Sequence, residues 1–124
     1  MLEDISRDLV DSAIRVHTAL GPGLLESAYE ACLTYELSSR GRYVERQRAL
    51  PVTYKAVELD VGYRLDLVID KQVVIELKSV ESLLPIREAQ LLSYMKLGGY
   101  RLGFLLNFNT RRMKDGIKRM VNHL

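Results

Sequence analysis

Apolar residues recur every three or four positions along the first part of the chain, which is the period of an α-helix. The first stripe stops at the helix breaker Gly21-Pro22-Gly23, and the second stops before Gly41. The first consists of Leu2, Ile5, Leu9, Ala13, Val16 and Leu20, and the second of Tyr29, Leu33 and Leu37. The pattern predicts two amphipathic helices, over residues 2–20 and about 24–40.

One carboxylate interrupts the second stripe. Glu26 lies three residues before Tyr29, which places it on the helix face predicted to be buried. An unpaired buried charge is costly, so the position of Glu26 calls for a structural or functional reason.

The middle of the chain changes to β-branched and alternating residues, which are typical of strands. It predicts three or four strands, over about residues 44–55, 57–69 and 72–79, with an irregularity near Gly62. Every one of these strands lies between the two predicted helices and a later helical segment.

A helical pattern returns after Pro85 and ends at Gly98-Gly99. Residues 101–107 then predict a fully buried strand, and residues 117–121 predict either a short edge strand or a helix. The order α-α-β-β-β-α-β predicts an α/β fold with a mixed central β-sheet flanked by helices.

The 124 residues are 48% hydrophobic and 27% charged, a composition that suits one globular domain over residues 1–124. The longest apolar runs, such as residues 102–108, are far shorter than the roughly 20 residues of a membrane span, and the N-terminus does not resemble a signal peptide. We therefore expect a cytoplasmic protein with no membrane partner. The single cysteine, Cys32, excludes an internal disulfide and a cysteine metal cluster.

The net charge of +2 is too small to indicate nucleic acid by itself, but the charges are unevenly placed. Residues 1–39 hold seven acids against two Arg, whereas later segments are strongly basic. Arginine predominates among the cations, and its planar guanidinium suits bidentate contact with phosphate. We predict nucleic-acid contacts from Arg64, Arg111, Arg112 and Lys114, with a solvated charged surface as the alternative for any one of them.

Residues 62–78 can be tested as a hairpin by their register. If a three-residue turn places Ile69 opposite Val73, the apolar residues of both strands share one side of the sheet. These are Leu65, Leu67 and Ile69 on one strand and Leu77, Ile75 and Val73 on the other. The same register places Asp66 directly opposite Glu76, with Cβ atoms about 5 Å apart.

Two carboxylates at such a short distance repel each other unless a cation lies between them. Lys78, on the same strand as Glu76, neutralises only part of their charge. Magnesium is commonly held by one or two carboxylates with water and substrate phosphate, so Asp66 and Glu76 indicate a Mg²⁺ site in which Mn²⁺ is expected to substitute. Lys78 then lies where it can orient the water that attacks a phosphodiester. A solvated ion pair of Glu76 and Lys78 is the alternative, and these residues alone do not decide between the two.

Gln90 and Tyr94 lie four residues apart on the predicted helix after Pro85. They share a face with Ile86 and Leu97, so we expect them to point toward the sheet. The glutamine amide or the tyrosine hydroxyl can there hold a lysine or a phosphate oxygen. Simple packing is the alternative for both residues.

Together these residues resemble the PD-(D/E)XK nuclease superfamily. The resemblance rests on Asp66, on Glu76-Leu77-Lys78, on the helical Glu26 upstream and on Gln90-x-x-x-Tyr94, which is similar to a feature of the RecB-like branch. Leu65 stands where the name of the superfamily has proline, which many members lack.

A closer resemblance lies in residues 23–30, Gly-Leu-Leu-Glu-Ser-Ala-Tyr-Glu, which look like the signature of the small GxxExxY proteins assigned to that superfamily. The similarity extends through Gln47, residues 50–54 and residues 105–108, so it covers nearly the whole chain.

The resemblance implies a restriction-endonuclease-like core in which Asp66 and Glu76 bind Mg²⁺ together with the main-chain carbonyl of Leu77. Glu26 would contribute to the metal site from its helix, and Lys78 would act on the attacking water. The implied catalytic set is Asp66, Glu76, Lys78, Glu26, Gln90 and Tyr94.

These features predict a metal-dependent nuclease that hydrolyses phosphodiesters of nucleic acid, with DNA as the expected form. A catalytically silent module of the same fold, which binds nucleic acid or protein, is the alternative, because the superfamily includes inactive members. Cleavage of RNA or of branched junctions is a third hypothesis, by analogy with small dimeric members of the superfamily. A domain of this size covers little of a duplex, which leaves a homodimer open.

Overall fold

A five-stranded sheet forms the centre of the computed structural model, which describes residues 1–123. The strand order is β1-β4-β5-β6-β7; β5 and β6 are parallel and the other neighbours are antiparallel. The strands are β1 (Val44–Ala49), β4 (Arg64–Ile69), β5 (Val73–Lys78), β6 (Leu102–Asn107) and β7 (Ile117–Val121). The sheet is therefore mixed, as predicted, and residues 117–121 adopt the edge strand rather than the helix.

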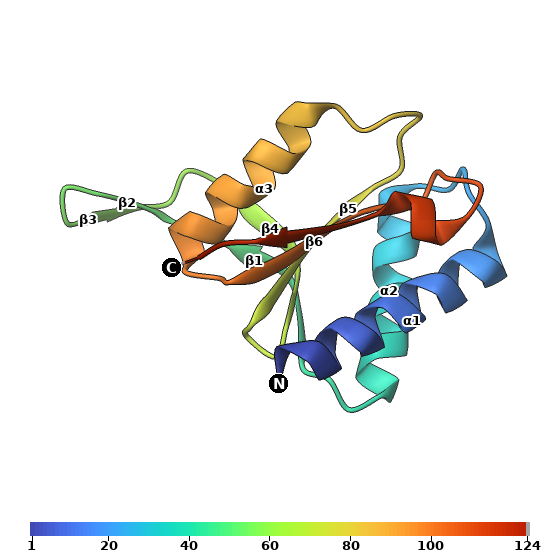
Figure 1. Ribbon diagram of the computed structural model, residues 1–124. Helices are drawn as coiled ribbons and strands as arrows, with labels where there is room; N and C mark the ends of the chain where they lie inside the picture. The colour runs from blue at the N-terminus through green and yellow to red at the C-terminus, as the bar shows by residue number, and fades with distance from the viewer. Residues whose placement is uncertain (124) are drawn as a thin grey trace.

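Helices cover both faces of this sheet. Two of them, α1 (Leu2–Leu20) and α2 (Glu26–Ser39), lie together on one face, and α3 (Pro85–Gly98) lies on the other, as Figure 1 shows. A short 3-10 helix, η1 (Met113–Gly116), precedes β7. Among residues 1–123, no helix is both long enough and apolar enough to cross a bilayer.

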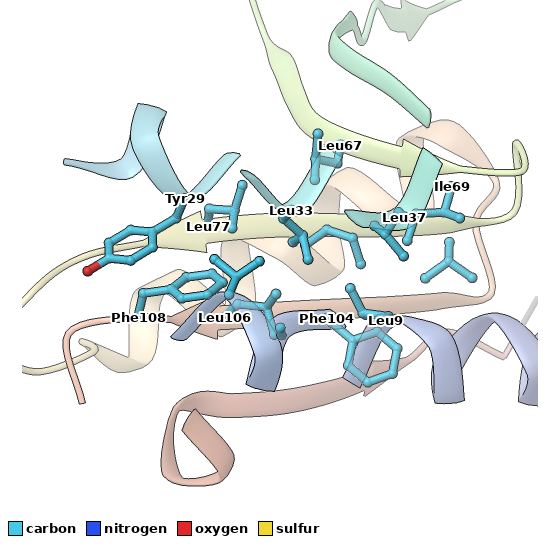
Figure 2. Packing of buried hydrophobic residues seen from close by; sticks show 14 of the residues in the cluster. Leu9, Tyr29, Leu33, Leu37, Leu67, Ile69, Leu77, Phe104, Leu106 and Phe108 are labelled. Atoms are coloured by element: carbon cyan, nitrogen blue, oxygen red, sulfur yellow. The ribbon is translucent and has the colours of Figure 1, made fainter. Parts of the chain in front are cut away.

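The larger hydrophobic core lies between α1, α2 and the sheet. The predicted stripe residues Leu9 and Leu33 are fully buried there against the inward side chains of β4, β5 and β6. The ring of Tyr29 stacks on that of Phe108, with centroids 4.4 Å apart and an interplanar angle of 10° (Figure 2). This stack joins the start of α2 to the residue that follows β6.

The smaller core lies under α3, where Leu91 and Met95 are buried. The prediction that Ile86 and Leu97 share the sheet-facing side is wrong, because these side chains are 63% and 42% exposed. The helix is rotated so that Leu91 and Met95 take the buried positions. Gly103 on β6 makes the contact with Met95 close, since a Cβ there would meet the Met95 sulfur at 2.8 Å.

The two long strands predicted for residues 44–55 and 57–69 are each divided. Their outer parts form a separate hairpin of β2 (Val52–Tyr54) and β3 (Val57–Leu59), which projects away from the sheet in Figure 1. Pro51 lacks the N–H that a continuous ladder needs, and Gly62 has a φ of 84°. These two residues bound the projection, called here the hairpin arm (residues 51–62).

Candidate active site

The β4-β5 hairpin has the predicted register up to the two carboxylates. Ile69 pairs with Val73, and the pairing continues for two further steps toward Asp66 and Glu76. At these acids, side chains replace the backbone ladder: the Leu77 amide donates to Asp66 Oδ2 at 2.8 Å, and the Asp66 amide donates to Glu76 Oε1 at 3.3 Å. Each carboxylate therefore takes a main-chain donor from the opposite strand, which holds the two acids side by side.

The strand β4 changes its alternation at Asp66. Leu67 packs in the core beneath α1 and α2, whereas Leu65 packs in the core beneath α3. The prediction that Leu65 shares a face with Leu67 and Ile69 is therefore wrong. Opposite Asp66, the β1 residue Gln47 has a left-handed φ of 50°, so both strands depart from regular geometry at this level.

This irregularity turns Asp66 toward α2, where it lines a small pocket of about 130 Å³. Helix α2 supplies Glu26 and Ser27 to the pocket, and β5 supplies Leu77. Glu26 is exposed, so its predicted position on a buried stripe is wrong. It begins α2, where the first turn lies open to solvent, but it lines the same pocket as Asp66.

A second acid of α2 occupies the buried position instead. Glu30 is only 8% exposed; it accepts a hydrogen bond from Gln47 Nε2 at 2.7 Å and pairs with Arg46 at 3.1 Å. The same Gln47 amide group donates to Asp66 Oδ1 at 3.3 Å. Neither Glu30 nor Gln47 was predicted to be a site residue, although Glu30 lies one helical turn after Glu26, a spacing that puts both on one side of α2.

Glu76 lies in the least favourable electrostatic surroundings of the site. Burial, and then the negative charge of Asp66, raise the pKa of Glu76 to about 8, while the positive charge of Lys78 acts in the opposite direction. The protein therefore supplies too little positive charge to compensate an ionised Glu76 beside Asp66.

A divalent cation fits this donor set. Asp66 and Glu76 supply adjacent carboxylate oxygens, and a cation between them offsets the repulsion that they otherwise experience. No group of three or more His, Cys, Asp or Glu within residues 1–123 is arranged to hold a metal. Two adjacent carboxylates are a donor set that a hard divalent cation such as Mg²⁺ can use, because it takes few protein carboxylates and keeps water or phosphate ligands.

Lys78 is the last residue of the central strand β5 and lies at the end of the sheet where several loops meet. Its carbonyl accepts the Phe108 amide at 2.9 Å, and the next residue, Ser79, donates through its hydroxyl to the Leu24 carbonyl at 2.6 Å. Lys78 itself is half-buried. These bonds fix the backbone at Lys78 between the loop before α2 and the loop after β6.

The other predicted site residues lie outside this centre. Gln90 donates to the Tyr94 hydroxyl at 2.9 Å and accepts from Arg87 at 3.4 Å, and both partners are on α3. Over the described part of the chain, neither Gln90 nor Tyr94 hydrogen-bonds to Lys78. Arg64, at the start of β4, pairs with Asp60 at 3.5 Å.

The chain belongs to the PD-(D/E)XK nuclease superfamily, whose family model matches residues 3–120. Its mixed five-stranded sheet with flanking helices agrees with the restriction-endonuclease-like fold of that superfamily. No curated protein sequence and no solved structure gives a significant match to the chain.

Proposed function

We propose that the protein is a magnesium-dependent nuclease that hydrolyses phosphodiesters of DNA. One observation carries the proposal: the carboxylates of Asp66 and Glu76 lie side by side, and each accepts a hydrogen bond from a main-chain amide of the opposite strand. Lys78 follows Glu76 by two residues on β5. Two adjacent carboxylates followed by a lysine form the set that phosphodiester hydrolysis needs, a cation site with a positive side chain beside it.

In this proposal, Asp66 and Glu76 hold the cation with the main-chain carbonyl of Leu77, and Glu26 approaches from the shared pocket. The bound cation supplies positive charge that stabilises the developing negative charge on the phosphate. The ammonium group of Lys78 orients the attacking water and a phosphate oxygen. A bond forms between the water oxygen and phosphorus while the bond between phosphorus and the leaving oxygen breaks; the attacking water loses a proton, and the leaving oxygen gains one.

The nucleic acid is proposed to lie along the same edge of the sheet. Arg64, the first residue of β4, and the loop that carries Arg111, Arg112 and Lys114 then contact phosphates. Gln90 and Tyr94, already hydrogen-bonded to each other, support the site from α3 by presenting polar groups to the substrate or to Lys78.

The test is cleavage of linear DNA, branched DNA and RNA with Mg²⁺, with Mn²⁺ and with EDTA. We expect DNA products that require the metal, and a loss of about a thousandfold or more in both Glu76→Ala and Lys78→Ala, because removal of a residue that acts on the reacting groups costs at least several kcal/mol. Lys71→Ala is the matched control, since Lys71 is an exposed lysine in the turn at the other end of the same hairpin.

Undiminished cleavage by Glu76→Ala would overturn the proposal. Products from RNA alone would retain the nuclease and replace DNA as its substrate. Salt-sensitive binding of DNA by folded wild-type protein, with no product in any metal, would instead support the catalytically silent binding module.

A further inference from the structure

A second pocket, of about 480 Å³, lies where the end of α1 meets the loop after β6. Its apolar lining includes Ile14, Pro22 and Met113, and its charged lining is Arg111, Arg112 and Lys114. Figure 1 shows the orange-red turn before η1 beside the blue loop that joins α1 to α2. The volume is within the range of pockets that hold organic ligands, and the lining combines apolar contact with positive charge.

The cations of this pocket are available to an anion. Arg111 and Lys114 form no ion pair with any side chain of residues 1–123, and Arg112 has only a 3.4 Å contact with Asp115 in which both side chains are largely exposed. In contrast, Arg40 and Arg42 each pair with more than one acid. The basic segment near residue 40 is thus already neutralised, and the loop after β6 is not.

The loop is also held in place before any ligand arrives. His17 Nε2 donates to the Thr110 carbonyl at 2.8 Å, and His17 is 8% exposed. Met113 is buried in the larger core. Gly116 packs so closely that an added Cβ would lie 2.0 Å from the Asn107 carbonyl oxygen. These contacts order the backbone of the loop that carries the cationic side chains before a ligand binds, which lowers the entropy lost on binding.

The pocket is close to the proposed catalytic centre. β5 and β6 are parallel and place Lys78 opposite Asn107, and the Phe108 amide binds the Lys78 carbonyl. Arg111 follows Phe108 by three residues, so their Cα atoms are at most about 11 Å apart. At a rise of about 3.4 Å per nucleotide, that distance corresponds to a few nucleotides of one strand.

We propose that this pocket binds one unpaired nucleotide of the strand that the nuclease cuts, a few nucleotides from the scissile bond. The inference rests on the proposed function and adds a preference for single-stranded or unpaired substrate. Arg111 and Lys114 bind the phosphates, and an arginine guanidinium plane stacks on the base. Ile14 and Pro22 contact the rest of the base. A base that is stacked and paired within a duplex is not available to a concave pocket.

The test measures binding separately from cleavage, by fluorescence anisotropy on a Glu76→Gln background at fixed salt. The ligands are a labelled single strand of about 12 nucleotides, the blunt duplex of the same sequence, and a nucleoside monophosphate as competitor. We expect the single strand to bind about tenfold more tightly than the duplex. Ile14→Glu should weaken single-strand binding by about tenfold and leave duplex binding within about twofold.

The matched control is Leu20→Glu, because Leu20 lies on the same helix with nearly the same exposure, 37% against 39% for Ile14, but outside the pocket. A double variant, Arg111→Ala with Lys114→Ala, tests the pocket without altering α1 and should also weaken single-strand binding.

Equal affinity for single strand and duplex, or equal losses in Ile14→Glu and Leu20→Glu, would overturn the inference. So would binding of the nucleoside monophosphate as tight as that of the single strand, since the occupant would then be a free nucleotide. Absence of cleavage by wild-type protein, together with pocket-dependent binding of the single strand, would reject the nuclease and keep the pocket.

Discussion

Glu30 and Glu76 are buried to the same degree, each 8% exposed, but their surroundings are opposite. Glu30 has a cation, Arg46, and an amide donor, Gln47. Glu76 has another carboxylate, Asp66, as its close neighbour, and the pKa of Glu76 is raised to about 8. The fold compensates the charge of Glu30 and leaves that of an ionised Glu76 uncompensated, which is where the proposed cation would bind. Equal burial therefore does not imply equal compensation of the charge.

The largest expected effect is on the pH dependence of stability. The folded state binds the Glu76 proton more tightly than the unfolded state, so stability is complete below pH 4.5 and falls as pH rises to about 8. At 1.36 kcal/mol per unit, the full shift from 4.5 to about 8 corresponds to a loss on the order of 5 kcal/mol. Glu76→Gln should remove this loss and be the more stable protein at pH 9 in EDTA, as measured by urea unfolding. Parallel pH profiles for the two proteins would contradict the compensation argument.

A divalent cation should reverse the same loss in the wild type. Ligand at a hundredfold excess over its Kd stabilises the folded state by about 3 kcal/mol. We therefore expect Mg²⁺ or Mn²⁺ to raise the Tm of wild-type protein at pH 8 and to have little effect on Glu76→Gln. An equal rise in both proteins would place the cation elsewhere on the surface.

Removal of the compensated acid should have the opposite result from removal of Glu76. Glu30→Ala leaves Arg46 and Gln47 without their carboxylate partner and is expected to destabilise the fold by about 2 kcal/mol at neutral pH. Glu45→Ala is the control, since the Glu45 side chain, which pairs with Arg48, is more exposed than that of Glu30 (23% against 11%), and its loss should cost less than about 1 kcal/mol. Equal unfolding midpoints for the two variants would show that burial of Glu30 contributes nothing.

The smallest effect concerns Gln47, which links the two acidic groups through Glu30 and Asp66. Its left-handed φ of 50° is strained for a residue with a side chain. Both Gln47→Ala and Gln47→Gly lose the hydrogen bonds, but glycine relieves the backbone strain and should be the more stable by about 1 kcal/mol. Chemical unfolding of the pair measures this difference, and a more stable alanine variant would refute the strain.

The opposition of Asp66 and Glu76 was predictable because the side-chain period of a strand is two residues, so one correctly placed turn sets the whole register. The change of face at Leu65 was not predictable, since it depends on hydrogen bonds between side chains and the neighbouring strand. Sequence periodicity also could not choose between Glu26 and Glu30. Both flank the Tyr29 stripe, and only the position of β1 decides which of them is buried.

The break between β1 and β2 could be predicted locally from Pro51, because proline lacks the N–H that a continuous strand ladder needs. The continued alternation of apolar residues obscured that signal, because the hairpin arm pairs its own two strands. Helix α3 shows a similar limit. Its apolar residues fit more than one rotation, and packing against Gly103 selects the one that buries Met95.

The hairpin arm has a consequence for how this chain can vary. The Leu50 amide donates to the Tyr63 carbonyl at 3.0 Å, and Ala49 pairs with Arg64, so the chain enters and leaves the arm at adjacent points. Residues 51–62 can therefore be shortened to a tight turn, or lengthened by an inserted module, without moving β1 relative to β4. The arm is the natural place for this architecture to acquire new parts while Gln47 and Asp66 keep their positions.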